Sequence, residues 1–160
     1  MRLFLLFSLC LLFSFGSAQA LTLKSADIKE GEKIGAKFVF SGFGCTGENA
    51  SPSLNWTDAP SGVKSFAVTM YDPDAPTGSG WWHWQVVNLP ASVRGLPRNA
   101  SADGLPAGAV QTRTDFGKPG YGGACPPPGH GKHRYQFTVW ALDVASLPLD
   151  ANILTVTVMA

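Results

Sequence analysis

Residues 65–88 read SFAVTMYDPDAPTGSGWWHWQVVN, two apolar runs separated by a segment rich in aspartate, proline and glycine. Runs of β-branched and aromatic residues that are bounded by such turn formers are typical of β-strands. We therefore expect a central strand at residues 65–71 and a second strand at residues 82–88. Side chains alternate between the two faces of a strand, so the aspartate that follows the first strand continues its apolar face.

The rest of the chain contains shorter segments of the same kind. We expect further strands at residues 21–28, 36–40, 53–56 and 133–142. A loop at residues 42–53 and an irregular connection at residues 90–110 are dense in Gly, Pro, Asn and Ser. No segment after residue 20 has a convincing helical period, although residues 152–159 fit a strand or a helix. This pattern predicts a mainly β fold, an antiparallel β-sandwich.

The N-terminus has the three parts of a secretory signal peptide. Arg2 supplies the positive charge, residues 3–15 are almost wholly apolar, and Ala18 and Ala20 form a small-x-small cleavage pattern. The alternative is an uncleaved membrane anchor, but the apolar run is shorter than the roughly 20 residues that a spanning helix needs. We expect cleavage of residues 1–20 and a periplasmic or secreted domain at residues 21–160, with no transmembrane span.

Two cysteines, Cys45 and Cys125, remain after the expected cleavage. An even number of cysteines in an exported protein favours a disulfide, and two buried thiols are the alternative. The bridge would close a loop of about 80 residues, for which chain entropy gives roughly 4 kcal/mol of stabilisation.

Composition argues against one large class of function. The formal net charge is +1, and the chain has no block of basic residues. Nucleic acid is therefore not an expected partner. The chain has no internal repeat or linker, so we expect a single domain.

Acidic side chains follow the central strand directly. Asp72 and Asp74 flank Pro73, which stiffens the backbone. One interpretation is that the carboxylates orient histidines or accept backbone hydrogen bonds in a binding site. The other is ordinary turn chemistry, since Asp and Pro are common turn formers.

Two histidines lie on other strand-like segments. Alternation puts His83 on the face opposite to Trp82 and Trp84, where it is either a structural residue or a donor in a desolvated pocket. His133 and Tyr135 share a face, so their polar groups can converge on one ligand. The side chain of Arg134, which lies between them, points away from this face and is expected to pair with an acidic residue.

A glycine and proline segment, GYGGACPPPGHGKHRY, covers residues 120–135. Gly120, Gly122 and Gly123 permit close backbone approach, and successive N–H groups in such a turn can form an anion-binding concavity. A flexible loop is the alternative, against which the three following prolines argue. The Asp and His residues are also of types that bind metal ions, so a metal site is a further alternative, but they lack the close spacing typical of metal ligands.

Several of these motifs, in this order, resemble the phosphatidylethanolamine-binding protein family and its bacterial Raf-kinase-inhibitor-like branch. The matching stretches are DPDAP at 72–76, WHW at 82–84, the segment at 120–135, and NASPSLNW at 49–56. The resemblance implies a β-sandwich with a small end pocket that binds phosphate-like anions and the phosphorylethanolamine head group. The ligand-binding residues implied at matching positions are Asp72, Asp74, Pro76, His83, Gly123, Pro126, Pro127, His133 and Tyr135.

Two positions depart from the family pattern. Ala124 stands where this branch usually has proline, which is expected to loosen the loop. Family members also continue after the position of Leu149 with a helix and a further strand, which this chain is expected to lack. Truncation and an altered end at residues 153–160 are both open explanations.

Together these observations favour an exported binding protein rather than an enzyme, with no cofactor and no metal. The expected ligand is a phosphate-bearing small molecule or a phospholipid head group. Two alternatives remain: a protein-interaction inhibitor of a kinase or protease, and a metal-dependent hydrolase that uses the His and Asp residues.

Overall fold

The computed structural model describes residues 21–153. The expected signal peptide at residues 1–20 and most of the tail, residues 154–160, lie outside the described residues. Between residues 21 and 153, no helix has the length and apolar character needed to cross a lipid bilayer.

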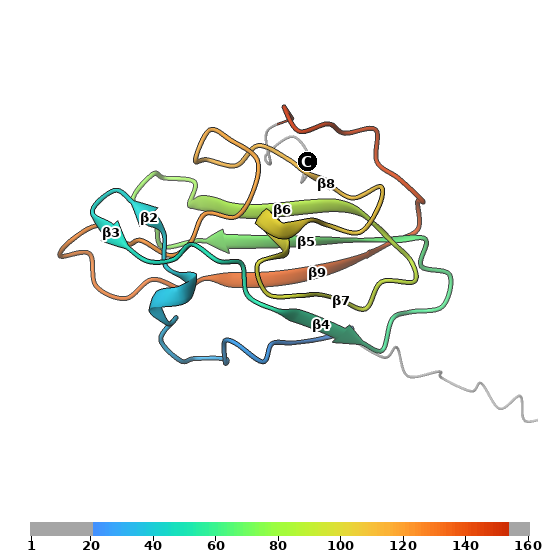
Figure 1. Cartoon of the computed structure of the whole chain (residues 1–160), viewed down its shortest axis with the longest axis horizontal. Coiled ribbons are helices and arrows are strands. Elements are labelled where there is room, and N and C mark those ends of the chain that lie inside the picture. The colour runs from blue at the N-terminus through green and yellow to red at the C-terminus, as the bar shows by residue number, and fades with distance from the viewer. Residues whose placement is uncertain (1–20, 154–160) are drawn as a thin grey trace, which may run out of the picture.

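A four-stranded antiparallel sheet forms the largest layer, in the order β8-β6-β5-β9. Its strands are β5 (Ser65–Asp72), β6 (Trp81–Pro90), β8 (Val110–Gln111) and β9 (Gln136–Leu142). Figure 1 shows β5 in the middle of this sheet, between β6 and β9. The two strands predicted around the DPDAP turn are therefore confirmed, and they pair with each other.

A three-stranded sheet forms the second layer, in the order β1-β4-β7. Its strands are β1 (Thr22–Lys24), β4 (Leu54–Thr57) and β7 (Gly95–Leu96). A separate hairpin of β2 (Ser41–Gly42) and β3 (Cys45–Thr46) lies at one end of the molecule (Figure 1).

The hydrophobic core draws side chains from both sheets. Leu54 and Trp56 alternate with exposed neighbours along β4, and both are 1% exposed. They pack in one cluster with Phe66, Val68 and Met70 of β5, all of which are 0% exposed. Removal of this apolar surface from water is the main favourable term of the fold. The prediction of a mainly β, antiparallel fold is confirmed.

The predicted strand at residues 36–40 is wrong. Its first part is a 3-10 helix, η1 (Ala36–Phe38), and only the end is extended. The hydroxyl of Tyr121 donates a hydrogen bond of 2.8 Å to the carbonyl of the last helical residue. The N–H of Phe40 then binds the carbonyl of Ala124 at 3.0 Å. Contacts with a distant loop, rather than local propensity, therefore determine the backbone here.

Other element boundaries also differ from the predicted ones, in part because side chains bind the backbone. The first strand ends early because Asp27 accepts the N–H of Ser53 at 2.7 Å and also binds Arg98. The loop at residues 42–53 contains β3, and the connection at residues 90–110 contains β7 and a single helical turn, α1 (Ala100–Asp103).

Candidate functional site

A β-bulge near the start of β6 determines how His83 is placed. Met70 of β5 is opposite Trp84, and Tyr71 is opposite Trp82, so His83 is an extra residue in the pairing. Strict alternation predicted Trp82 and Trp84 on one face, and this is wrong because a bulge shifts the register. Trp82 contacts the ring of Tyr71 at 4.5 Å, whereas Trp84 is fully buried in the core.

A cavity of about 190 Å³ opens beside this bulge. Its ionisable side chains are Asp72, His83 and His133, which come from the end of β5, from β6 and from the segment before β9. Most of the remaining lining is apolar: Phe43, Ala75, Pro76, Trp81, Phe116, Cys125, Pro126 and Pro127, together with Thr77. Of the nine site residues expected from the sequence, six therefore line one cavity.

Asp72 and His133 form a buried hydrogen-bonded pair. The Nδ1 atom of His133 is 2.7 Å from Oδ2 of Asp72, and the two side chains are 2% and 4% exposed. Because a carboxylate only accepts, Nδ1–H is the donor and the ring orientation is fixed. The other carboxylate oxygen of Asp72 accepts the N–H of Asp74 at 2.9 Å. The Nε2 atom of His133 is 3.3 Å from Nδ1 of the exposed His130.

His83 is held by the glycine segment. Its Nδ1 atom is 2.8 Å from the carbonyl oxygen of Gly122, which assigns the proton to Nδ1 and leaves Nε2 for a ligand. Burial lowers the pKa of His83 below its usual value near 6.5. The Gly122 carbonyl and the charges of Asp72 and Asp115 act in the opposite direction but do not outweigh burial.

Asp74 has a different role from Asp72. Both carboxylate oxygens bind the guanidinium of Arg134, with Nε–Oδ2 at 2.9 Å and Nη2–Oδ1 at 2.7 Å. This pair, with the Arg134 backbone N–H, lowers the pKa of Asp74 to about 2. The prediction that Arg134 partners an acid is confirmed. The side chain of Asp74 neither orients a histidine nor lines the cavity.

The glycine segment contributes close packing rather than free donors. Its N–H groups bind within the protein: Tyr121 to Ser101 Oγ, Gly122 to His83 O, and Gly123 to Asn49 Oδ1. The expectation that Gly122 and Gly123 donate to a ligand therefore fails. A Cβ on Gly123 would lie 2.4 Å from the Phe38 carbonyl oxygen, so only glycine allows this approach.

Tyr135 lies behind the two histidines. Its ring centre is 5.2 Å from that of His83 and 6.5 Å from that of His133. Burial raises the pKa of Tyr135, and the backbone of Cys125 acts in the opposite direction without outweighing burial. Its ring packs near both imidazoles but does not line the cavity.

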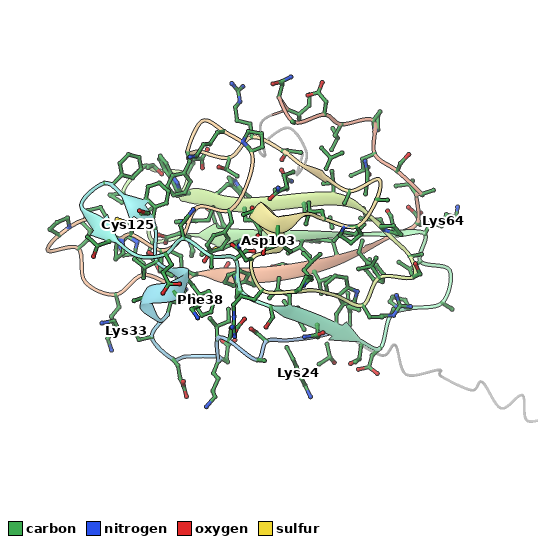
Figure 2. The ribbon with its side chains drawn as sticks, viewed as in Figure 1. Lys24, Lys33, Phe38, Lys64, Asp103 and Cys125 are labelled. Atoms are coloured by element: carbon green, nitrogen blue, oxygen red, sulfur yellow. A yellow bond between two sulfur atoms is a disulfide. The ribbon has the colours of Figure 1, made fainter. Side chains whose placement is uncertain are left out.

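A disulfide joins Cys45 to Cys125, which confirms the predicted pairing over two buried thiols. Cys45 begins β3, and Cys125 lies in the proline segment that lines the cavity. Figure 2 shows Cys125 at the end of the molecule where the β2–β3 hairpin lies. The bridge therefore ties the hairpin to the wall of the cavity.

Sequence reasoning missed three aromatic lining residues, Phe43, Trp81 and Phe116. Trp81 directly precedes the WHW motif at residues 82–84, but no sequence motif near Phe43 or Phe116 indicated that either residue belongs to a site. No cluster of three or more metal-ligating side chains occurs within the part of the chain that the structure describes.

Comparisons with known proteins identify the family of this chain. A sequence model of the phosphatidylethanolamine-binding protein family matches residues 24–160. The UPF0098 protein YbcL of Escherichia coli is 58% identical over 153 residues, which cover 92% of this chain and 84% of the relative. The UPF0098 protein YbhB of the same organism is 56% identical over 130 residues, covering 80% and 82%.

Solved structures show the same fold. The crystal structure of E. coli YbcL, described as a new member of the mammalian PEBP family, superposes with a TM-score of 0.85 at 56% identity and covers 87% of each chain. A PEBP homologue from Chlamydia trachomatis gives a TM-score of 0.73 at 32% identity, covering 88% of this chain and 86% of that one.

Proposed function

Because the chain belongs to the phosphatidylethanolamine-binding protein family, we propose that it is an exported binding protein for phosphate-bearing small molecules or phospholipid head groups, and not an enzyme. The observation that carries the proposal is the convergence of His83 and His133 on one cavity with a largely apolar lining. A few polar groups in such a cavity are typical of small-molecule sites.

The hydrogen bonds of the two imidazoles define how an anion is held. Each ring donates Nδ1–H within the protein, to Gly122 O or to Asp72, so Nε2 can donate to a phosphate oxygen only when that ring is protonated. The carboxylate of Asp72 fixes the orientation of the His133 ring through a hydrogen bond of 2.7 Å. Charge-assisted bonds from a protonated ring to phosphate are about twice as strong as neutral ones. Phosphate binding therefore takes up protons.

Phosphate and phosphorylethanolamine are expected to bind more weakly as pH rises. Burial favours neutral His83 in the free protein, whereas a bound anion favours its protonated form, so affinity falls as pH rises through the pKa of the complex. Each ligand at 100 times its Kd should add about 2.7 kcal/mol of stability, or about 5–11 °C in Tm. Thermal shift and titration calorimetry between pH 5 and pH 8 measure both effects.

The matched variants are His83→Asn and His130→Ala. Asparagine can still donate to Gly122 O but cannot take up a proton, so its contribution to the pH dependence should disappear. His130 does not line the cavity, but its Nδ1 is 3.3 Å from Nε2 of His133 and competes with a ligand for that nitrogen, so His130→Ala should not weaken phosphate binding. Wild-type binding that is equal at pH 5 and pH 8, after correction for the second ionisation of the phosphate ligand, would remove the histidines from the mechanism.

The export part of the proposal rests on the charged, apolar and small-residue pattern of residues 1–20. When the full chain is produced in a bacterium, the mature protein is expected in the periplasm or medium with Leu21 as its first residue. Intact mass spectrometry of each cell fraction tests this. A full-length mass in the cytoplasmic fraction alone would contradict it.

A further inference from the structure

One wall of the cavity is a continuous row of aromatic rings. Phe116 is at its centre, with its ring 5.3 Å from His83, 5.6 Å from Trp81 and 5.9 Å from Phe43. Phe43 and Phe116 are nearly parallel, with an interplanar angle of 11°. The row therefore runs from an imidazole that faces the cavity to an aromatic side chain at the surface.

The outermost ring is held in an unfavourable position. Phe43 is 74% exposed and has a φ of 51°, although bulky residues rarely adopt positive φ. It and Gly44 (φ 85°) are the two loop residues of the β2–β3 hairpin, where Asn-Gly is the usual choice. Neither burial nor turn geometry explains a phenylalanine here. Strained backbone of this kind clusters at ligand-binding sites.

The hairpin is fixed relative to the cavity. The disulfide from Cys45 to Cys125 joins it to the proline segment, and the Phe43 ring also contacts Phe40 at 5.3 Å. Phe43 itself lines the cavity, together with Pro126 of that segment. The aromatic ring is thus held at the cavity wall, although most of its surface remains exposed.

These observations point beyond a bare phosphate. The cavity volume of about 190 Å³ far exceeds the roughly 10–15 Å³ that one water needs, so an ester group also fits. We infer that Phe43 is a specificity residue that favours phosphate monoesters whose ester group is an aromatic ring. The phosphate meets His83 and His133, and the aryl ring packs against Phe116 and Phe43. This inference rests on the proposed phosphate-binding function.

The experiment compares four ligands by titration calorimetry at pH 6: inorganic phosphate, phosphorylethanolamine, cyclohexyl phosphate and phenyl phosphate. Aromatic pairs contribute beyond their buried area, so the wild-type protein should bind phenyl phosphate roughly three- to tenfold more tightly than cyclohexyl phosphate. In Phe43→Asn this preference should disappear, while affinity for inorganic phosphate stays within about twofold, since 0.4 kcal/mol is a twofold change.

Phe43→Asn also separates a binding role from a structural one. Asparagine tolerates positive φ, so relief of backbone strain should offset the lost ring contacts and keep Tm within about 2 °C of wild type. Val144→Asn is the matched control, because Val144 is an exposed apolar residue (41%) that does not line the cavity. It should leave all four affinities unchanged.

The outcomes distinguish this inference from the function on which it rests. If inorganic phosphate and phosphorylethanolamine bind but phenyl and cyclohexyl phosphate bind equally well, aromatic selection is overturned and phosphate binding stands. The same holds if Phe43→Asn keeps the full preference. If none of the four ligands binds, both proposals fail.

Discussion

The double variant Cys45→Ser/Cys125→Ser is expected to lose about 4–5 kcal/mol of unfolding free energy, a large share of the 5–15 kcal/mol of a typical domain. The bridge links residues that are 80 positions apart, so its loss frees a long loop in the unfolded chain. Urea unfolding followed by tryptophan fluorescence measures the change as a shift in midpoint.

The effect should also be local. Without the bridge, the pairing of Val39 with Ala124 still holds together the residues just before the hairpin and just before Cys125, but the cross-link between β3 and Cys125 itself is lost. The proposed preference of Phe43 for aryl phosphates should therefore shrink along with stability. Reduced wild-type protein is the control, because it removes the cross-link without changing the side chains. A loss below about 1 kcal/mol in both samples would contradict the prediction.

The strands of this fold were predictable where one face is buried. Phe66, Val68 and Met70 alternate with their neighbours because they face the second sheet. Burial of that face requires apolar residues at every second position, and this alternation is visible in the sequence. Residues 36–40 also contain aromatic and β-branched residues, but Ala36–Phe38 form a 3-10 turn, since the Tyr121 hydroxyl binds the backbone there from 83 positions away. A contact of that range leaves no local pattern in the sequence.

The sequence predicted which residues belong to the candidate site better than it predicted what each of them binds. Asp72, His83 and His133 stood out because ionisable side chains beside prolines and tryptophans are unusual. Their hydrogen bonds depend on the bulge in β6 and on which carboxylate meets which partner, and neither is encoded by spacing. Phe43 and Phe116 were not predicted as lining residues, because a phenylalanine in a loop has no polar group that would mark it as part of a binding site.

Two residues of the glycine segment make contacts that differ from those expected of them. Gly123 matched a family position and was expected to donate its N–H to a ligand, yet that N–H binds Asn49. Its importance is steric, because the backbone of Phe38 occupies the space that a side chain would need. Ala124 was expected to loosen the loop, but it is 4% exposed, and its carbonyl accepts the N–H of Phe40.

The variant His133→Ala is expected to lose about 3–5 kcal/mol of unfolding free energy and to abolish measurable phosphate binding. Removing the imidazole leaves the Asp72 carboxylate, which is 4% exposed in the intact protein, with the Asp74 N–H as its one remaining hydrogen bond among the described residues. A buried polar group that loses its partner incurs its full desolvation cost. Urea unfolding gives the stability change, and calorimetry with inorganic phosphate gives the affinity.

A double-mutant cycle separates the pair from the cost of the cavity left by the ring. If Asp72 is destabilising only when unpaired, Asp72→Asn/His133→Ala should be more stable than the sum of the two single changes predicts, by roughly 0.5–3 kcal/mol. Arg134→Gln is the matched control, because it breaks the neighbouring but exposed pair with Asp74 and should cost much less. Strict additivity in the cycle would show that the Asp72–His133 hydrogen bond does not hold the binding histidine in place.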